Sequence, residues 1–70
     1  MITKLKEMRK SRKLTQVSLS KLSGVSQQTI SNIEMMVRPD PQLSTAMKLC
    51  RALHCSVYDL VDEEEMQNVR

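Results

Sequence analysis

Four uncharged polar residues lie close together in the sequence and could form hydrogen bonds with the edges of DNA bases. They are Gln27, Gln28, Ser31 and Asn32. A Gln or Asn amide carries a donor and an acceptor together, as adenine N6 and N7 require in the major groove. An ordinary solvated helix surface is the alternative, but such surfaces usually carry Lys and Glu, and neither occurs between Gln27 and Ile33. The residue types therefore favour base recognition.

The more reactive side chains, Cys50, His54 and Cys55, form no recognisable catalytic or metal-binding motif. Zinc sites usually combine four ligands in paired short spacings, which two cysteines and one histidine do not provide. The single histidine has no Ser or Cys at catalytic spacing, and the chain has no glycine-rich phosphate loop. We therefore expect no enzyme activity, no cofactor and no metal, and Cys50, on an apolar stripe, is most simply a core residue.

Two short helices joined by a tight turn would present the four polar side chains. Thr15 can cap the first helix with its hydroxyl group. Gly24 can take the left-handed backbone that ends this helix, and Ser26 can cap the next one. At ~100° of rotation per residue, Ile30 and Ile33 then face the core while the polar residues face outward.

Residues 2–12 are predicted to form an N-terminal helix, because apolar residues recur there at helical spacing. Arg9 lies four residues after Leu5, at the edge of this stripe, and Glu34 likewise lies four residues after Ile30. The two charges could meet as a partly buried ion pair that sets the N-terminal helix against the polar one. Two separately solvated side chains are the alternative.

Two more helices are predicted after a connector over residues 35–40. The core stripe of the helix over residues 43–53 comprises Leu43, Ala46, Met47, Cys50 and Leu53. His54 follows at the position where a helix commonly ends in a left-handed residue, a conformation that His tolerates. Ser56 and Asp59 resemble a capping box that opens the last helix.

Length and composition limit the chain to one small domain. A chain of 70 residues buries only ~60% of the surface that its unfolded form exposes. With Tyr58 as its one aromatic residue, the core must come from aliphatic side chains and Met, which suits packed helices. We expect a domain over residues 1–62 and a frayed acidic tail over residues 63–70. No apolar run approaches the ~20 residues of a membrane span and no signal peptide appears, so a cytoplasmic protein is expected.

The charge of the chain is unevenly distributed. Residues 1–38 carry eight Lys or Arg and two acidic residues, a net charge of +6, whereas residues 39–70 carry three and six, a net charge of −3. A basic half often indicates a polyanionic partner, although a solvated surface has the same composition. The acidic half should lie away from any nucleic acid.

The spacing of several residues resembles the five-helix domain of the Cro and phage-repressor helix-turn-helix family, often called the xenobiotic-response-element family. The matching positions are Thr15, Gln16, Leu19, Gly24, Val25, Ser26, Ile30, Ile33, Glu34, Pro41, Leu43 and Leu60. The resemblance covers residues 2–61. It implies an all-α, lambda-repressor-like fold whose second and third helices form the helix-turn-helix.

The family resemblance also implies a function, a sequence-specific repressor that binds a palindromic operator in double-stranded DNA as a dimer. The residues that would read bases are Gln27, Gln28, Ser31 and Asn32. The residues that would contact the DNA backbone are Gln16, Thr29, Lys10, Lys13 and Arg38. By the same analogy Gln16 would support Gln27 and Gln28. The expected dimer interface comprises Cys55, Val57, Tyr58 and Val61. A protein of this type would act at the nucleoid of a bacterium and could be encoded by a phage.

The connector after Glu34 departs from the family pattern. The family usually has Asn-Gly-Lys or similar there, whereas this chain has Met35, Met36 and Val37. These side chains could pack on the following helix or touch another molecule. An exposed apolar patch often marks a protein partner, so an antitoxin-like or adaptor module on the same fold is the alternative function. A regulatory protein partner is also possible for a repressor.

Overall fold

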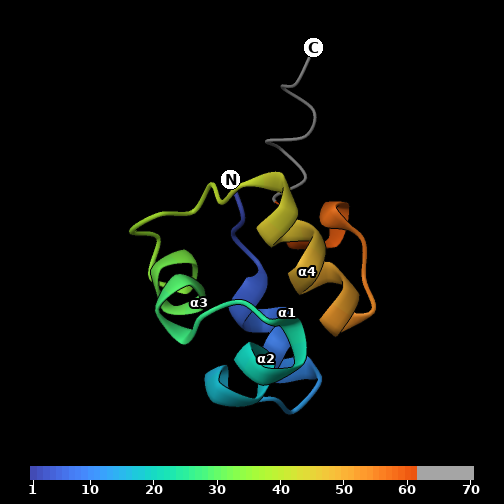
Figure 1. The fold of residues 1–70 in the computed structure, drawn as a ribbon. Helices are drawn as coiled ribbons and strands as arrows, with labels where there is room; N and C mark the ends of the chain where they lie inside the picture. The colour runs from blue at the N-terminus through green and yellow to red at the C-terminus, as the bar shows by residue number, and fades with distance from the viewer. Residues whose placement is uncertain (62–70) are drawn as a thin grey trace.

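The computed structural model describes residues 1–61 and contains four α-helices followed by one turn of 3-10 helix (Figure 1). The elements are α1 (Leu5–Ser11), α2 (Gln16–Ser23), α3 (Gln27–Glu34), α4 (Leu43–Leu53) and η1 (Val57–Leu60). The all-α prediction is confirmed, but the prediction of five α-helices is wrong. The last element cannot continue as an α-helix because Val61 is extended and forms an isolated antiparallel bridge with Ile2. The predicted tail over residues 63–70 lies outside the described residues.

The N-terminal helix begins at Leu5, three residues later than predicted. The amide of Ile2 donates to the carbonyl of Pro39 at 2.8 Å, and the amides of Thr3 and Lys4 both donate to the carbonyl of Leu60 at 3.0 Å. These bonds satisfy the backbone without a helix, and Ile2 is buried all the same. The apolar spacing therefore identified a core residue correctly but assigned it to the wrong backbone conformation.

The core is a cluster of aliphatic side chains from every element, as the composition suggests. Its fully buried members are Leu5, Leu19, Ile30, Ile33, Leu49, Leu53 and Leu60. The predicted stripe on α4 was partly wrong, because Leu43 is 70% exposed and Met47 is 50% exposed. The stripe that faces the core runs through Ala46, Leu49, Cys50 and Leu53. Leu43 and Met47 lie on the flank of this stripe, where no described element covers them.

The turns that separate the helices follow from capping residues. Thr15 accepts a hydrogen bond from the amide of Ser18 at 3.0 Å, and Ser26 accepts one from the amide of Thr29 at 3.2 Å. Gly24 ends α2 with a φ of 78°. His54 ends α4 in the left-handed conformation, with φ 53° and ψ 48°.

The helices pack so that α3 lies at one side of the molecule. α2 packs against both α3 and α4, α1 packs against α3, and α4 packs against η1. In Figure 1, α3 is on the left and α4 on the right, with α1 and α2 between and below them. One side of α3 therefore remains open to solvent.

Candidate nucleic-acid interface

The open side of α3 carries the four polar residues singled out in the sequence. Gln27 and Gln28 are exposed, while Ser31 and Asn32 are half-buried. The amide nitrogen of Gln28 donates to Oδ1 of Asn32 at 3.1 Å. This bond uses one of the two amide hydrogens of Gln28 and leaves the other, together with its carbonyl oxygen, for another molecule. The hydroxyl group of Ser31 donates to Sδ of Met35 at 3.5 Å.

The end of α3 is tied to α1 by an ion pair between Arg9 and Glu34. Nε of Arg9 donates to Oε2 of Glu34 at 2.7 Å, and Nη2 donates to Oε1 at 3.1 Å. Nη1 of Arg9 donates to the carbonyl of Leu14 at 2.7 Å. Both partners are shielded from water, with 10% of the Arg9 side chain and 3% of the Glu34 side chain exposed. The geometry is the bidentate arrangement that gives the strongest pairs of this kind.

Gln16 at the start of α2 also binds this pair. Its amide nitrogen donates to Oε1 of Glu34 at 3.1 Å. Among the described residues the Gln16 side chain thus contacts Glu34 rather than Gln27 or Gln28, which the family analogy had suggested. A buried carboxylate is a stronger acceptor than a neutral amide, which accounts for this choice.

These contacts shift the pKa values of both partners. The hydrogen bond from Arg9 to Glu34 raises the pKa of Arg9, although burial opposes it. Burial alone would raise the pKa of Glu34, but the hydrogen bonds from Arg9 and Gln16 outweigh it and lower the pKa below the ordinary 4.5. The pair is therefore fully charged at neutral pH.

A polar groove of about 380 Å³ lies between α3 and the beginning of α4. Its lining residues are Thr29, Asn32, Arg38, Asp40, Pro41, Gln42 and Thr45. Thr45 was not singled out in the sequence, and Gln42 was considered only as a possible cap of the following helix; the signal that could have identified both as site residues is their place just after Pro41, where α4 starts. Gln42 is the N-cap residue of α4 and its side chain does not cap the helix. The first amides of a helix have no partner within the helix, so this end of α4 can bind an anion.

The cationic residues that are predicted to contact the DNA backbone lie at two places in the structure. Lys10 and Lys13 are exposed at the end of α1, with Lys13 in the left-handed region at a φ of 57°. Arg38 is exposed and lines the polar groove. Thr29 is half-buried, and its hydroxyl oxygen accepts a hydrogen bond from Ser26 at 2.8 Å.

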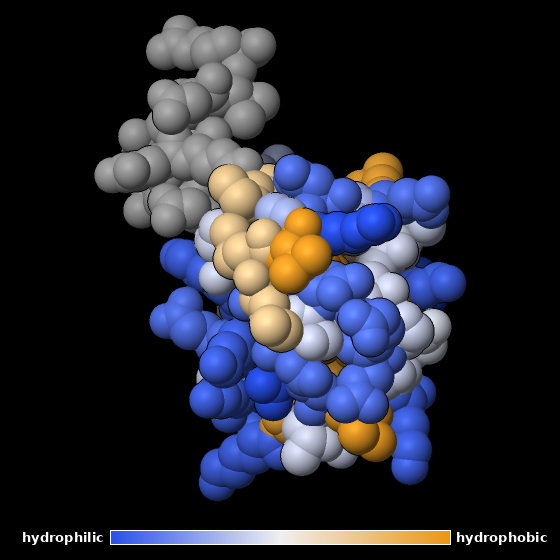
Figure 2. All heavy atoms as spheres, turned by 90° about the vertical axis from the view of Figure 1, so that its left-hand side faces the viewer, coloured by the Kyte–Doolittle hydropathy of each residue, from blue (hydrophilic) through white to orange (hydrophobic). Residues whose placement is uncertain are grey.

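The connector after α3 turns sharply and exposes apolar side chains. Met35 is 69% exposed, Met36 46% and Val37 62%, so a large part of each side chain is open to solvent. Met36 has a left-handed backbone, with a φ of 62°. Figure 2 views the molecule from the α3 side and shows an apolar patch within a largely hydrophilic surface.

A second apolar surface lies away from α3, around the beginning of α4 and η1. Val57 is 37% exposed and Tyr58 70% exposed, while Cys55 and Val61 are half-buried. A groove of about 240 Å³ is formed there by Met1, Ile2, Pro39, Asp40, Pro41, Leu43, Ala46, Val57 and Val61. Of the four predicted dimer residues, Val57 and Val61 line this groove together with Leu43.

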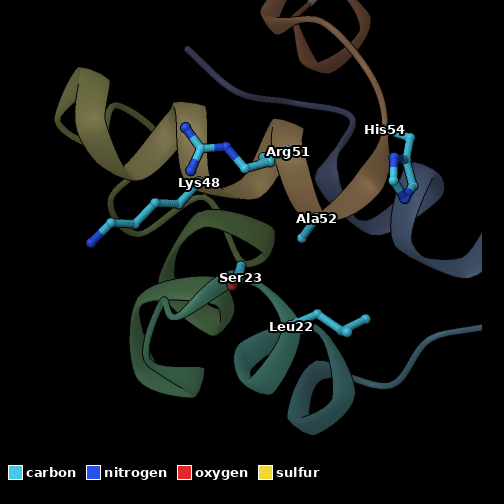
Figure 3. A pocket seen from close by; sticks show the side chains of 6 residues that line it. All are labelled: Leu22, Ser23, Lys48, Arg51, Ala52 and His54. Carbon is cyan, nitrogen blue, oxygen red and sulfur yellow. The ribbon is translucent and has the colours of Figure 1, made fainter.

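A third hollow, of about 310 Å³, lies between the end of α2 and the end of α4 (Figure 3). It contains the cationic side chains of Lys48 and Arg51 together with His54. Figure 3 shows these three side chains pointing in different directions, so they do not converge on one ligand. In the part of the chain that the structure describes, no three His, Cys, Asp or Glu side chains are placed to hold a metal ion.

Burial and the proximity of the two thiols to each other determine how readily the cysteines ionise. Both are free thiols, with Cys50 buried and Cys55 half-buried. Burial raises the pKa of Cys50, and burial together with the adjacent Cys50 raises the pKa of Cys55 to about 11. Neither thiol is activated as a nucleophile. Within residues 1–61, no helix has the length and apolar character needed to cross a membrane.

Comparison with known proteins agrees with this geometry. The sequence model of a family described as helix-turn-helix matches residues 5–60. Among solved structures, the chain is similar to the N-terminal DNA binding domain of SinR from Bacillus subtilis, with 28% sequence identity and a TM-score of 0.80 over 87% of this chain and 88% of that one. No curated protein sequence gives a significant match.

Proposed function

Since the chain belongs to the helix-turn-helix family of the Cro and phage-repressor type, we propose that it is a sequence-specific, double-stranded DNA-binding transcription regulator. We further propose that it represses transcription by binding a palindromic operator as a dimer at the bacterial nucleoid. The observation that carries the proposal is the outward amide pair of Gln28 and Asn32 on α3, the element that the fold leaves open at one side. The likeness to a DNA binding domain supports it.

In the proposed complex α3 lies in the major groove, and its polar residues contact base edges. Gln28 keeps a free amide hydrogen and a free carbonyl oxygen, the pair of groups that adenine N7 and N6 can bind. Oδ1 of Asn32 accepts the other amide hydrogen of Gln28, and Asn32 would present its own amide hydrogens to a base. Gln27, in the first turn, and Ser31 complete the reading set.

The DNA backbone would be held on both sides of this helix. The polar groove beside Asn32 offers the guanidinium of Arg38 and the unpartnered amides at the start of α4 to one phosphate. Lys10, Lys13 and the hydroxyl of Thr29 are the other proposed backbone contacts. Binding should therefore weaken steeply as the salt concentration rises.

Selection of binding sequences from random duplex DNA tests the proposal. An enriched palindrome is the expected result, because two copies related by two-fold symmetry read equivalent half-sites. On the selected site, Gln28→Ala should cost ~1–3 kcal/mol and relax one base position. Leu22→Ala is the matched control, since Leu22 is 63% exposed on α2 and lines the hollow opposite α4. Equal weakening by Gln28→Ala on every sequence would refute a base-reading role.

The proposed dimer forms through Cys55, Val57, Tyr58 and Val61. Tyr58 is 70% exposed and follows Val57, which lines an apolar groove, and a large exposed aromatic side chain is typical of an interface anchor. Sedimentation at tens of micromolar, with and without the selected site, should show a dimer that Tyr58→Lys abolishes. A monomer under both conditions would overturn this part of the proposal.

A protein-interaction module is the second candidate function, and the exposed apolar connector is the observation that favours it. An adaptor or antitoxin-like protein of this kind would have lost its DNA site while retaining the fold. It predicts no enrichment in the selection experiment. The intact polar surface of α3 favours the regulator.

A further inference from the structure

The apolar connector is attached directly to the proposed reading helix. The backbone amides of Val37 and Arg38 both donate to the carbonyl of Asn32, at 2.9 and 3.1 Å, and the amide of Met36 donates to the carbonyl of Ile33 at 3.1 Å. The chain therefore folds back against the last turn of α3. The left-handed backbone of Met36 makes this reversal possible.

This reversal places Val37 next to a residue that is proposed to read bases. Val37 is bonded through its amide to Asn32, and its side chain remains 62% exposed. The polar groove that would bind a phosphate is lined by the adjacent Arg38 and by Asn32 itself. An exposed apolar residue thus adjoins Asn32 and Arg38, two of the proposed DNA contacts.

The chemistry of the connector restricts what it can bind. A valine side chain cannot form a hydrogen bond with a phosphate or with a polar base edge. The one apolar group on a base edge in the major groove is the C5-methyl group of thymine. A separate protein partner is less well matched, because a stable interface needs about 800 Å² from each side, far more than three adjacent side chains offer.

We propose that Val37 packs against the C5-methyl group of a thymine at the edge of the half-site, next to the base contacted by Asn32. Val37 is then a specificity-determining residue. This inference rests on the proposed DNA-binding function and adds to it a preference for thymine at one defined position.

Replacing thymine by deoxyuridine tests the inference, because the two bases differ only in the methyl group. Each thymine of the selected operator is replaced in turn, and the dissociation constant of the wild-type protein is measured. One outer position should show about a fourfold loss, the equivalent of one buried methyl group at ~0.8 kcal/mol. Val37→Ala should bind the thymine and deoxyuridine sites equally. Val37→Thr, which keeps the shape but adds a hydroxyl group, should reduce the discrimination.

A control variant makes the outcome specific. Leu22→Ala removes another exposed apolar side chain, 63% exposed on α2, and should keep the fourfold discrimination. The inference is overturned if the wild-type protein shows no outer position sensitive to the methyl group, or if Val37→Ala keeps the sensitivity. Failure of the wild-type protein to select any DNA sequence would instead refute the proposed function, so the two failures are distinguishable.

Discussion

The ion pair between Arg9 and Glu34 allows a quantitative test of how α3 is held in place. Removing one partner of a buried ion pair costs about 3–5 kcal/mol, because the other charge is left without compensation. A domain of this size has a total stability of about 4–10 kcal/mol at the usual value per residue. Arg9→Met should therefore remove a large part of the stability, and it also deprives the carbonyl of Leu14 of its donor.

The double variant Arg9→Met, Glu34→Leu distinguishes the interaction between the two side chains from the contacts that each makes with other groups. Replacing both members by apolar residues is often neutral or stabilising, although the carbonyl of Leu14 and the amide of Gln16 then lose their partner, at about 1 kcal/mol each. The double variant should thus be more stable than Arg9→Met alone. Urea denaturation at pH 7, followed by circular dichroism, is measured for the wild type, Arg9→Met, Glu34→Leu and the double variant. Costs below about 1 kcal/mol that simply add would show that the pair behaves like an exposed one, and would refute the reasoning.

The pH dependence of the stability of the same variants tests the ion pair independently, through the direction in which stability changes with pH. In the wild-type protein the pKa of Glu34 is lowered from 4.5, so the pair contributes its full stability above about pH 4.5 and loses it as the pH falls through the folded-state value. In Arg9→Met the burial of Glu34 is opposed by fewer hydrogen bonds, and its pKa should rise above 4.5. The variant then gains stability relative to the wild type on acidification. Denaturation at pH 6, 5 and 4 measures this, and a stability difference that grows as the pH falls would contradict the assignment.

Further predictions concern the turns, the helix caps and a thiol. Gly24→Ala should destabilise the protein by about 1–2 kcal/mol. The cost comes from backbone strain alone, because φ is 78° and an added Cβ meets nothing within 4 Å. His54→Gly should raise the melting temperature, because glycine adopts the left-handed backbone of this position without strain. Thr15→Ala and Ser26→Ala should each cost ~1 kcal/mol in urea denaturation, and costs near zero would show that the caps are replaced by water. Because the pKa of Cys55 is raised to about 11, its alkylation by iodoacetamide at pH 8 should be much slower than that of free cysteine, and an equal rate would contradict its burial.

Local features of the sequence predicted the helix-turn-helix well because its structure is determined locally. Thr15, Gly24 and Ser26 each act within one turn of the chain, through a hydroxyl cap or a permitted φ angle. The end of α4 at His54 is of the same kind. Such caps and turn residues depend on only a few neighbouring residues, so they can be recognised without knowledge of the tertiary structure.

The errors arose where distant residues decide the outcome. Ile2 is extended because its amide finds the carbonyl of Pro39, which no local pattern indicates. Leu43 fits the helical spacing of α4, yet it is exposed because no described element covers that flank. The last element, η1, is also short because of a distant contact, since Val61 pairs with Ile2 in the N-terminal segment. In the candidate site, the groove beside Thr45 also depends on how α4 meets α3.

Gln16 belongs to the locally determined helix-turn-helix but also makes a contact with a distant residue, Glu34, and this contact leads to the last prediction. The carboxylate of Glu34, the final residue of α3, is bound by Arg9 from α1 and by Gln16 from α2. Three helices therefore meet at one side chain, at the end of the helix whose polar surface is proposed to read bases. If Gln16 acts by positioning α3, Gln16→Leu should weaken operator binding more than non-specific DNA binding and leave the salt dependence unchanged. If it contacts a phosphate instead, the specific and non-specific affinities should fall by the same factor, and the salt dependence should again stay unchanged because the Gln16 amide carries no charge. Fluorescence anisotropy on specific and random duplexes at several salt concentrations separates the two roles, and the hydrogen bond to Glu34 favours the first.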